Sequence, residues 1–151
     1  MAARQPPAHG PVAQGGAISE SLASMIAAAR SVANEVPPDA AREALAGGAV
    51  KLVVDVREPE EFREGHVPDA VNIPRGLLEI RADPASPSAD ASLSAERSAR
   101  VLVYCTKGPG ARSLFAARTL MDMAYENVDV LAGGLHAWAE AGLPVERSMA
   151  G

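Results

Sequence analysis

Cysteine is almost absent from this chain of 151 residues, which contains only Cys105. A single cysteine cannot form a disulfide within the chain, and this is typical of a protein in a reducing compartment. It also excludes a second thiol in the same chain, so any covalent adduct on Cys105 must be discharged by an external group. His and Cys do not cluster at the spacing of a zinc site, and we therefore predict neither a metal nor another cofactor.

Aromatic residues, positive charge and long apolar runs are also scarce. Aromatics make up 3% of the residues, so the core must be aliphatic. The net charge is -5, without a basic stripe that would indicate a nucleic-acid surface. No run approaches the roughly 20 apolar residues that span a bilayer, and the N-terminal sequence lacks the order of a secretory signal. We expect a cytoplasmic protein that binds neither nucleic acid nor a membrane.

The chain divides into a single domain with flanking segments. Residues 1–16 are rich in Pro, Gly and Ala and predict a disordered tail, and residues 148–151 predict a second tail. Residues 17–34 predict a helix whose apolar side chains share one face, with Ser19 or Ser21 as its cap. We expect this helix to pack on its own domain. The alternative is a homodimer formed through residues 18–33.

Residues 35–147 alternate between strand and helix patterns. Buried strands are predicted at 52–56, 70–74, 101–104 and 128–131, with a short edge strand near 34–38. Helices are predicted at 39–45 with Asp39 as cap, from Pro59, at 75–81, at 113–123 and around 135–138. Residues 83–98 predict a loop that is either a surface excursion or an active-site flap. The alternation predicts an α/β fold with a mostly parallel sheet covered on both faces.

Residues 101–113 combine a buried strand, a glycine-containing turn and the start of a helix around the only cysteine. Gly108 and Gly110 allow the backbone to turn its amides inward, as in anion-binding cradles. The positive end of the following helix points to the same place. The thiolate form of Cys105 is favoured by the loop amides, by the helix terminus, and by Lys107 and Arg112. The stretch therefore predicts a nucleophile beside an anion site.

Four motifs, in this order, resemble the single-domain rhodaneses, and the resemblance covers roughly residues 35–147. They are DVREPEEF at 55–62, GHVPDAVNIP at 65–74, Tyr104-Cys105 with Arg112-Ser113, and Gly133-Gly134 through Trp138 to Pro144. The resemblance implies a rhodanese-like α/β fold and a sulfurtransferase. In that family the cysteine takes the outer sulfur of thiosulfate or a related donor, becomes a persulfide, and passes the sulfur to cyanide or a thiol.

The resemblance also assigns roles to residues. Cys105 would be the nucleophile, and the expected partners are a small anionic sulfur donor and a small-molecule or protein thiol acceptor. Asp55, Arg57 and Ser113 would support the site, whereas His66 would be structural. The residues expected to bind the donor are Thr106, Lys107, Gly108, Pro109, Gly110, Ala111 and Arg112.

The loop after Cys105 departs from the family pattern. Sulfurtransferases of this family usually have Cys-x4-Arg-Ser, whereas this chain has Cys-x6-Arg-Ser. Related phosphatases and arsenate reductases have Cys-x5-Arg, but those phosphatases place His before the nucleophile, where Tyr104 stands here. Sulfur transfer is the first hypothesis. The alternatives are a non-catalytic rhodanese-like module that carries sulfur or binds a partner, and an oxyanion phosphatase or arsenate reductase.

Overall fold

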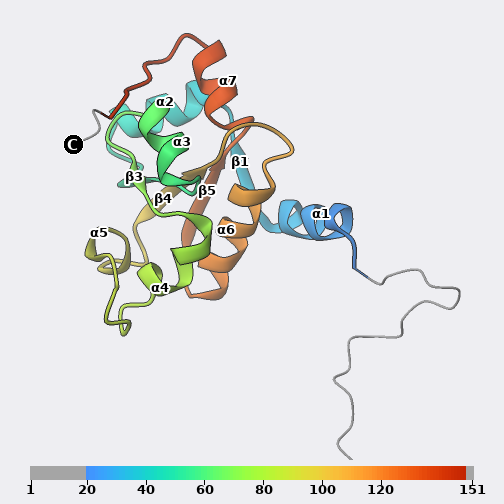
Figure 1. Cartoon of the computed structure of the whole chain (residues 1–151), viewed down its shortest axis with the longest axis vertical. Coiled ribbons are helices and arrows are strands. Elements are labelled where there is room, and N and C mark those ends of the chain that lie inside the picture. The colour runs from blue at the N-terminus through green and yellow to red at the C-terminus, as the bar shows by residue number, and fades with distance from the viewer. Residues whose placement is uncertain (1–19, 149–151) are drawn as a thin grey trace, which may run out of the picture.

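The computed structural model describes residues 20–148, and Figure 1 shows their arrangement. The predicted tail at 1–16, the first residues of the predicted helical segment at 17–34, and residues 149–151 lie outside the described residues. Within the described part of the chain, no helix is both long enough and apolar enough to cross a membrane.

A five-stranded sheet forms the centre of the domain, and all its strand pairs are parallel. The strand order is β1-β5-β4-β2-β3, so β4 lies in the middle. The strands are β1 (Asn34–Val36), β2 (Leu52–Asp55), β3 (Val71–Asn72), β4 (Arg100–Tyr104) and β5 (Asn127–Leu131). This arrangement confirms the predicted α/β fold with a parallel sheet.

Helices cover both faces of the sheet and create two apolar cores. They are α1 (Leu22–Val32), α2 (Pro38–Ala46), α3 (Pro59–Glu64), the short 3-10 helix η1 (Arg75–Leu77), α4 (Leu78–Ala82), α5 (Ala91–Ser94), α6 (Ala111–Asp122) and α7 (Gly134–Glu140). One core contains residues of α1, α4, α5 and α6, and the other contains residues of α2 and α7. Figure 1 shows α2 and α7 on one side of the sheet and α4 and α6 on the other.

Side chains of β4 alternate between these two cores, as the period of a strand requires. Val101, Val103 and Cys105 belong to the core under α6, whereas Leu102 and Tyr104 belong to the core under α2 and α7. The alternation assigns Cys105 to the α6 side of the sheet. The sequence position of Cys105, an even number of residues after Val101 and Val103, thus places it on the side of the sheet covered by α6.

Helix α1 packs against α6, as we predicted from its apolar face. Its N-cap is Ser21, whose side chain accepts a hydrogen bond from the amide of Ser24, and Ala29 is fully buried. Leu22, Met25 and Val32 remain exposed. The homodimer through residues 18–33 stays a prediction.

The structure corrects the predicted cap of one helix and excludes one of the two alternatives for residues 83–98. Helix α2 begins with Pro38 after an N-cap at Pro37, because proline suits the first helical turn, and Asp39 lies inside that turn. Residues 83–98 include the helix α5, and their end lies at the amino ends of β4 and β5, where the amide of Glu126 donates to the carbonyl of Arg97. Cys105 lies at the opposite, carboxyl end of β4, so this loop is not an active-site flap.

Candidate active site around Cys105

Cys105 lies directly after β4, the central strand, and is buried. Helix α6 begins at Ala111, so the intervening loop leads from the end of the strand to the amino end of a helix. Parallel α/β sheets place their sites at the carboxyl ends of strands. Cys105 is therefore in the position that this architecture favours for chemistry.

An open hollow of about 350 Å³ lies over the sulfur. Seven of its eight lining residues come from the loop and the start of α6, and the eighth is Glu61 of α3. They are Glu61, Cys105, Thr106, Lys107, Pro109, Gly110, Ala111 and Arg112. The structure thus brings the nucleophile together with most of the predicted donor-binding residues. Gly108 belongs to the same loop but is outside this lining set.

Ser113 contacts the sulfur from the first turn of α6. Its Oγ lies 3.2 Å from Cys105 Sγ and 3.1 Å from the carbonyl oxygen of Gly110, to which it donates. Gly110 has φ of 73°, and a Cβ there would lie 3.3 Å from Ser113 Oγ and 4.0 Å from Sγ. A side chain at position 110 would be strained and tight against Ser113 Oγ, which explains the glycine at this position.

Arg112 forms an ion pair with Glu61 at the rim of the hollow. Nη1 donates to Oε1 at 2.7 Å and Nη2 donates to Oε2 at 3.2 Å, and Nη2 also donates to Thr106 Oγ1 at 3.2 Å. The hydrogen bond from Arg112 lowers the pKa of Glu61 to about 2, and the Glu61 hydrogen bond raises the pKa of Arg112. Glu61 therefore offsets much of the positive charge that Arg112 brings to the hollow.

Glu61 is a functional residue that the sequence reasoning missed. Its position in the acidic first turn of α3 indicated only a favourable interaction with the helix end. It does accept a hydrogen bond from the amide of Glu58 at 3.0 Å, as a helix-capping residue does. Its pairing with Arg112 joins residues 51 positions apart, and no local spacing signals such a contact.

The amino end of α7 holds the backbone of the nucleophile loop. The amide of Leu135 donates to the carbonyl of Cys105 at 2.9 Å, and the amide of His136 donates to that of Thr106 at 2.8 Å. Gly134 has φ of 62°, and a Cβ there would lie 2.6 Å from the carbonyl oxygen of Cys105. Only glycine allows this approach at position 134, whereas a Cβ at Gly133 would instead lie 2.5 Å from that of Ala137.

Lys107 is exposed and lines the same hollow as Cys105. Its ammonium group thus belongs to the surface of the site, while Arg112 is already paired with Glu61. Within residues 20–148, Lys107 forms no ion pair, so its charge is not offset by a carboxylate as that of Arg112 is.

Asp55 and Arg57 form a buried ion pair that supports the neighbouring strand end. Arg57 Nη2 lies 2.7 Å from Asp55 Oδ2 and donates to the Gly65 carbonyl at 2.6 Å. Burial alone lowers the pKa of Arg57, but the hydrogen bond and charge of Asp55 raise it overall. The guanidinium carbon lies 5.7 Å from the ring centroid of Tyr104, which is on the other face of the sheet from Cys105. The pair braces β2 and Tyr104 rather than lining the hollow.

His66 has the structural role that we predicted. It is buried, its Nδ1 lies 2.8 Å from the carbonyl oxygen of Phe62, and its ring stacks on that of Phe62 with centroids 3.8 Å apart. It also forms a backbone bridge with Glu146. These contacts tie the end of α3 to the C-terminal segment.

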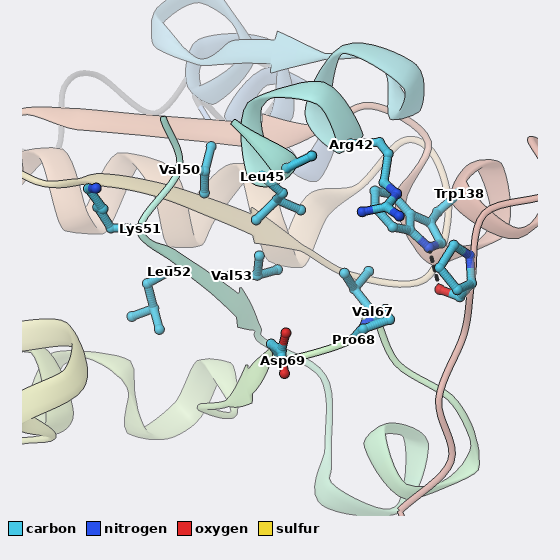
Figure 2. Close-up of a pocket in the computed structure, with 12 residues that line it drawn as sticks. Arg42, Leu45, Val50, Lys51, Leu52, Val53, Val67, Pro68, Asp69 and Trp138 are labelled. Atoms are coloured by element: carbon cyan, nitrogen blue, oxygen red, sulfur yellow. Dashed lines mark hydrogen bonds between the residues drawn. The ribbon is translucent and has the colours of Figure 1, made fainter. Parts of the chain in front are cut away.

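A second hollow, of about 290 Å³, lies between α2, β2 and α7 (Figure 2). Figure 2 shows Arg42 beside Trp138 and Lys51 at the far end of the hollow, with Asp69 between them. It lies on the opposite face of the sheet from Cys105 and lacks a nucleophile. Among residues 20–148, no group of three or more His, Cys, Asp and Glu side chains is arranged to hold a metal ion.

Comparisons with known proteins agree with this geometry. Residues 37–141 match the Rhodanese-like domain family. A sulfurtransferase of Allochromatium vinosum is 36% identical over 74% of this chain and 94% of its own length. The chloroplastic thiosulfate sulfurtransferase 16 of Arabidopsis thaliana is 34% identical over 62% of this chain and 78% of its own. A solved Rhodopseudomonas palustris protein of unknown function, described as a possible tyrosine phosphatase, is 32% identical with a TM-score of 0.77, over 89% of this chain and 100% of that chain.

Proposed function

The chain belongs to the rhodanese family and has a sulfurtransferase-like function, and from this premise we propose that it transfers a sulfane sulfur through a persulfide on Cys105. The proposed donor is thiosulfate or a related small anion, and the acceptor is a small-molecule or protein thiol, or cyanide in an assay. A relative named as a thiosulfate sulfurtransferase supports this choice of donor. A cytoplasmic location, where thiols stay reduced, remains a prediction.

One observation carries the proposal: the only cysteine of the chain lies at the base of an open hollow lined by Lys107 and Arg112. Thiosulfate carries two negative charges and exposes a sulfur that a thiolate can attack. A lining with a free ammonium group and loop amides suits the sulfonate end of such a donor. A purely structural cysteine would not need a charged opening above its sulfur.

The first half of the reaction forms the persulfide. The thiolate of Cys105 attacks the outer sulfur of thiosulfate, a new S–S bond forms, and the S–S bond of thiosulfate breaks. The bonding electron pair leaves with sulfite. Charge moves from Sγ to the departing sulfite, so Lys107 and the amides of residues 106–108 and 111 would stabilise both the donor and the leaving group.

The second half returns the enzyme to its starting state. An acceptor thiolate attacks the terminal sulfur of the persulfide, takes it with formation of a new S–S bond, and releases the Cys105 thiolate. Cyanide would take the same sulfur to give thiocyanate. Because the chain has no second cysteine, the acceptor must come from outside it. This is covalent catalysis in two displacements, and neither step needs a metal.

The direct test is an intact-mass measurement. The reduced full-length protein is incubated with thiosulfate, and we expect a gain of one sulfur atom that cyanide removes, with sulfite and thiocyanate formed in equal amounts. Cys105→Ser should lose the adduct and the turnover while keeping its fold. The absence of an adduct on the reduced native protein would overturn the proposal.

A second candidate is an oxyanion hydrolase or reductase. It is favoured by the long Cys-x6-Arg loop and by the description of the Rhodopseudomonas palustris protein as a possible tyrosine phosphatase. The engagement of Arg112 with Glu61 disfavours it, because a phosphate needs that guanidinium for its own oxygens. Assays with p-nitrophenyl phosphate, arsenate and thiosulfate in parallel separate the candidates, and we expect turnover with thiosulfate only.

The third candidate is a non-catalytic module that carries sulfur or binds a partner. It shares the Cys105 persulfide but lacks fast discharge. Persulfide formation followed by slow transfer to every acceptor tested would favour it. We expect instead that at least one low-molecular-weight thiol regenerates the free Cys105 within each cycle of turnover.

A further inference from the structure

Arg30 connects the N-terminal helix to the nucleophile loop. Its Nη2 donates to the carbonyl oxygen of Pro109 at 2.9 Å, across 79 positions of sequence. Its Nε donates to Glu35 Oε2 at 3.1 Å, so β1 holds the guanidinium from the other side. Arg30 lies outside the segment that matches the Rhodanese-like domain family, residues 37–141.

The contact falls within the part of the loop that departs from the family spacing. The peptide unit between Pro109 and Gly110 is held at both ends, because the carbonyl accepts from Arg30 and the amide of Gly110 donates to the carbonyl of Lys107 at 3.1 Å. The carbonyl of Gly110 in turn accepts from Ser113 Oγ, which touches Cys105 Sγ. A continuous series of contacts therefore runs from α1 to the sulfur.

Arg30 acts on the hollow through the loop rather than by its own charge. The guanidinium is not among the groups that line the hollow, whereas Pro109 and Gly110 are. Its ion pair with Glu35 also offsets its charge. What Arg30 contributes is the position of the Pro109–Gly110 peptide, and hence the width of the opening above Cys105.

We propose that Arg30 is a positioning residue for donor binding and that helix α1 is an added part of the active site. The expected change in KM rests on the proposed sulfur transfer, whereas the contacts of Arg30 with the loop do not. The lengthened loop, with Gly108, Pro109 and Gly110, needs an anchor outside the domain core, and α1 supplies it. Without that anchor the loop would sample wider openings and hold a small anion less well.

The first test measures hydrogen exchange without substrate. In Arg30→Ala of the full chain, we expect the amide of Gly110 to exchange at least several-fold faster, because the peptide unit loses one of its two hydrogen bonds. Amides of β4 should keep their rates. Unchanged exchange at Gly110 would overturn the proposal, whatever the activity of the protein.

The second test is kinetic. Arg30→Ala should raise KM for thiosulfate roughly three- to tenfold, the loss expected for one hydrogen bond of ordinary strength, with a smaller change in kcat. Arg30→Lys, which keeps a charged donor, should recover part of the loss.

Arg42→Ala is the matched control, because Arg42 is an exposed arginine on α2 that lines the hollow on the other face of the sheet. An equal rise of KM in Arg42→Ala would show a general charge effect and would overturn the proposal. If wild-type protein has no thiosulfate activity, the proposed function fails, and the exchange measurement alone decides the role of Arg30.

Discussion

Glu61 on α3 holds Arg112 on α6 through two parallel hydrogen bonds, with Nη1–Oε1 at 2.7 Å and Nη2–Oε2 at 3.2 Å. The paired ends stand at the rim of the hollow over Cys105. This ion pair gives different roles to the two cations that line the hollow, Arg112 and Lys107. Arg112 ties the loop to α3, and Lys107 remains available to attract an anion.

Glu61→Gln should tighten the binding of anionic donors. The change keeps Oε1 as an acceptor for the amide of Glu58 but removes the negative charge that offsets Arg112. We expect KM for thiosulfate to fall roughly two- to fivefold, the size typical of a partly exposed charge interaction, and to rise again with salt. Glu60→Gln, an exposed neighbour in the same helical turn, is the control. Equal effects in both variants would show that KM responds to the net charge of this surface and not to the Glu61–Arg112 ion pair.

The Glu61–Arg112 pair should stabilise the fold at neutral pH and lose that effect in acid. The pKa of Glu61 is lowered from 4.5 to about 2, chiefly by the Arg112 hydrogen bond. A group whose folded-state pKa is depressed contributes fully above its unfolded pKa and loses the contribution as pH falls toward the folded value. The stability difference between wild type and Glu61→Gln should therefore be constant above pH 4.5 and shrink between pH 4.5 and 2, as measured by urea unfolding. A constant difference across that window would contradict the assignment.

Ser113→Ala should slow the reaction of Cys105 with iodoacetamide at neutral pH. A thiolate accepts hydrogen bonds, and when Cys105 ionises the Ser113 hydroxyl, 3.2 Å from Sγ, can turn its single proton from the Gly110 carbonyl to the sulfur. We expect a loss of roughly three- to tenfold in the alkylation rate, in line with one hydrogen bond of ordinary strength. Ser94→Ala removes another buried serine hydroxyl, on α5, and should leave the rate unchanged. An unchanged rate in Ser113→Ala would show that the hydroxyl serves only Gly110.

Gly134→Ala should damage both stability and sulfur transfer. Its Cβ would lie 2.6 Å from the carbonyl oxygen of Cys105 and 2.8 Å from that of Thr106, so the nucleophile loop must move. Gly142→Ala is matched for backbone strain, since Gly142 has φ of 77° with nothing within 4 Å. We expect the control to lose about 1–2 kcal/mol of unfolding free energy with normal turnover. Gly134→Ala should lose more and should turn over thiosulfate more slowly, and equal behaviour of the two variants would contradict this.

Asp55→Asn should destabilise the protein strongly. It leaves Arg57, which is 4% exposed, without its buried counter-charge. Breaking a buried pair in this way costs about 3–5 kcal/mol. Glu79→Gln breaks the exposed Arg75–Glu79 pair instead and should cost under ~1 kcal/mol. Urea unfolding compares the variants, and similar losses would contradict the difference in burial as the cause.

Much of the fold could be predicted from local patterns. The apolar runs at 52–56 and 101–104 predicted β2 and β4, and the alternation with helices predicted the parallel sheet. The expectations failed for the cap of α2 and for the flap alternative at 83–98, where helix capping and tertiary contacts decided the structure. Pro38 moved the start of α2 ahead of Asp39, and the loop at 83–98 was placed by its contacts with β5 at the end of the sheet away from Cys105.

The residues of the candidate site also divide into those that local sequence predicts and those that it does not. Cys105, Lys107 and Arg112 could be predicted because they belong to one continuous stretch, in which loop composition and a helix start mark an anion site. Glu61 and Arg30 could not, because each reaches the loop from a distant element, across 51 and 79 positions. Local spacing also does not encode what these side chains do: Glu61 offsets the charge of Arg112, and Arg30 donates a hydrogen bond to the carbonyl of Pro109.

By itself, the sequence determined that the chain has one cysteine, at the end of a buried strand and before a glycine-containing turn, and it predicted that this cysteine is a nucleophile whose adduct needs an external acceptor. Composition and local periodicity carry that information, because strand, turn and helix are set by neighbouring residues. Only the tertiary structure decided that, within residues 20–148, Arg112 is ion-paired and Lys107 is not, and which side chain from α1 contacts the lengthened loop. Both depend on side chains from distant elements, Arg30 on α1 and Glu61 on α3, which the fold brings to the loop after Cys105. The net charge of the hollow and the position of the loop therefore depend on tertiary neighbours, which local sequence does not specify.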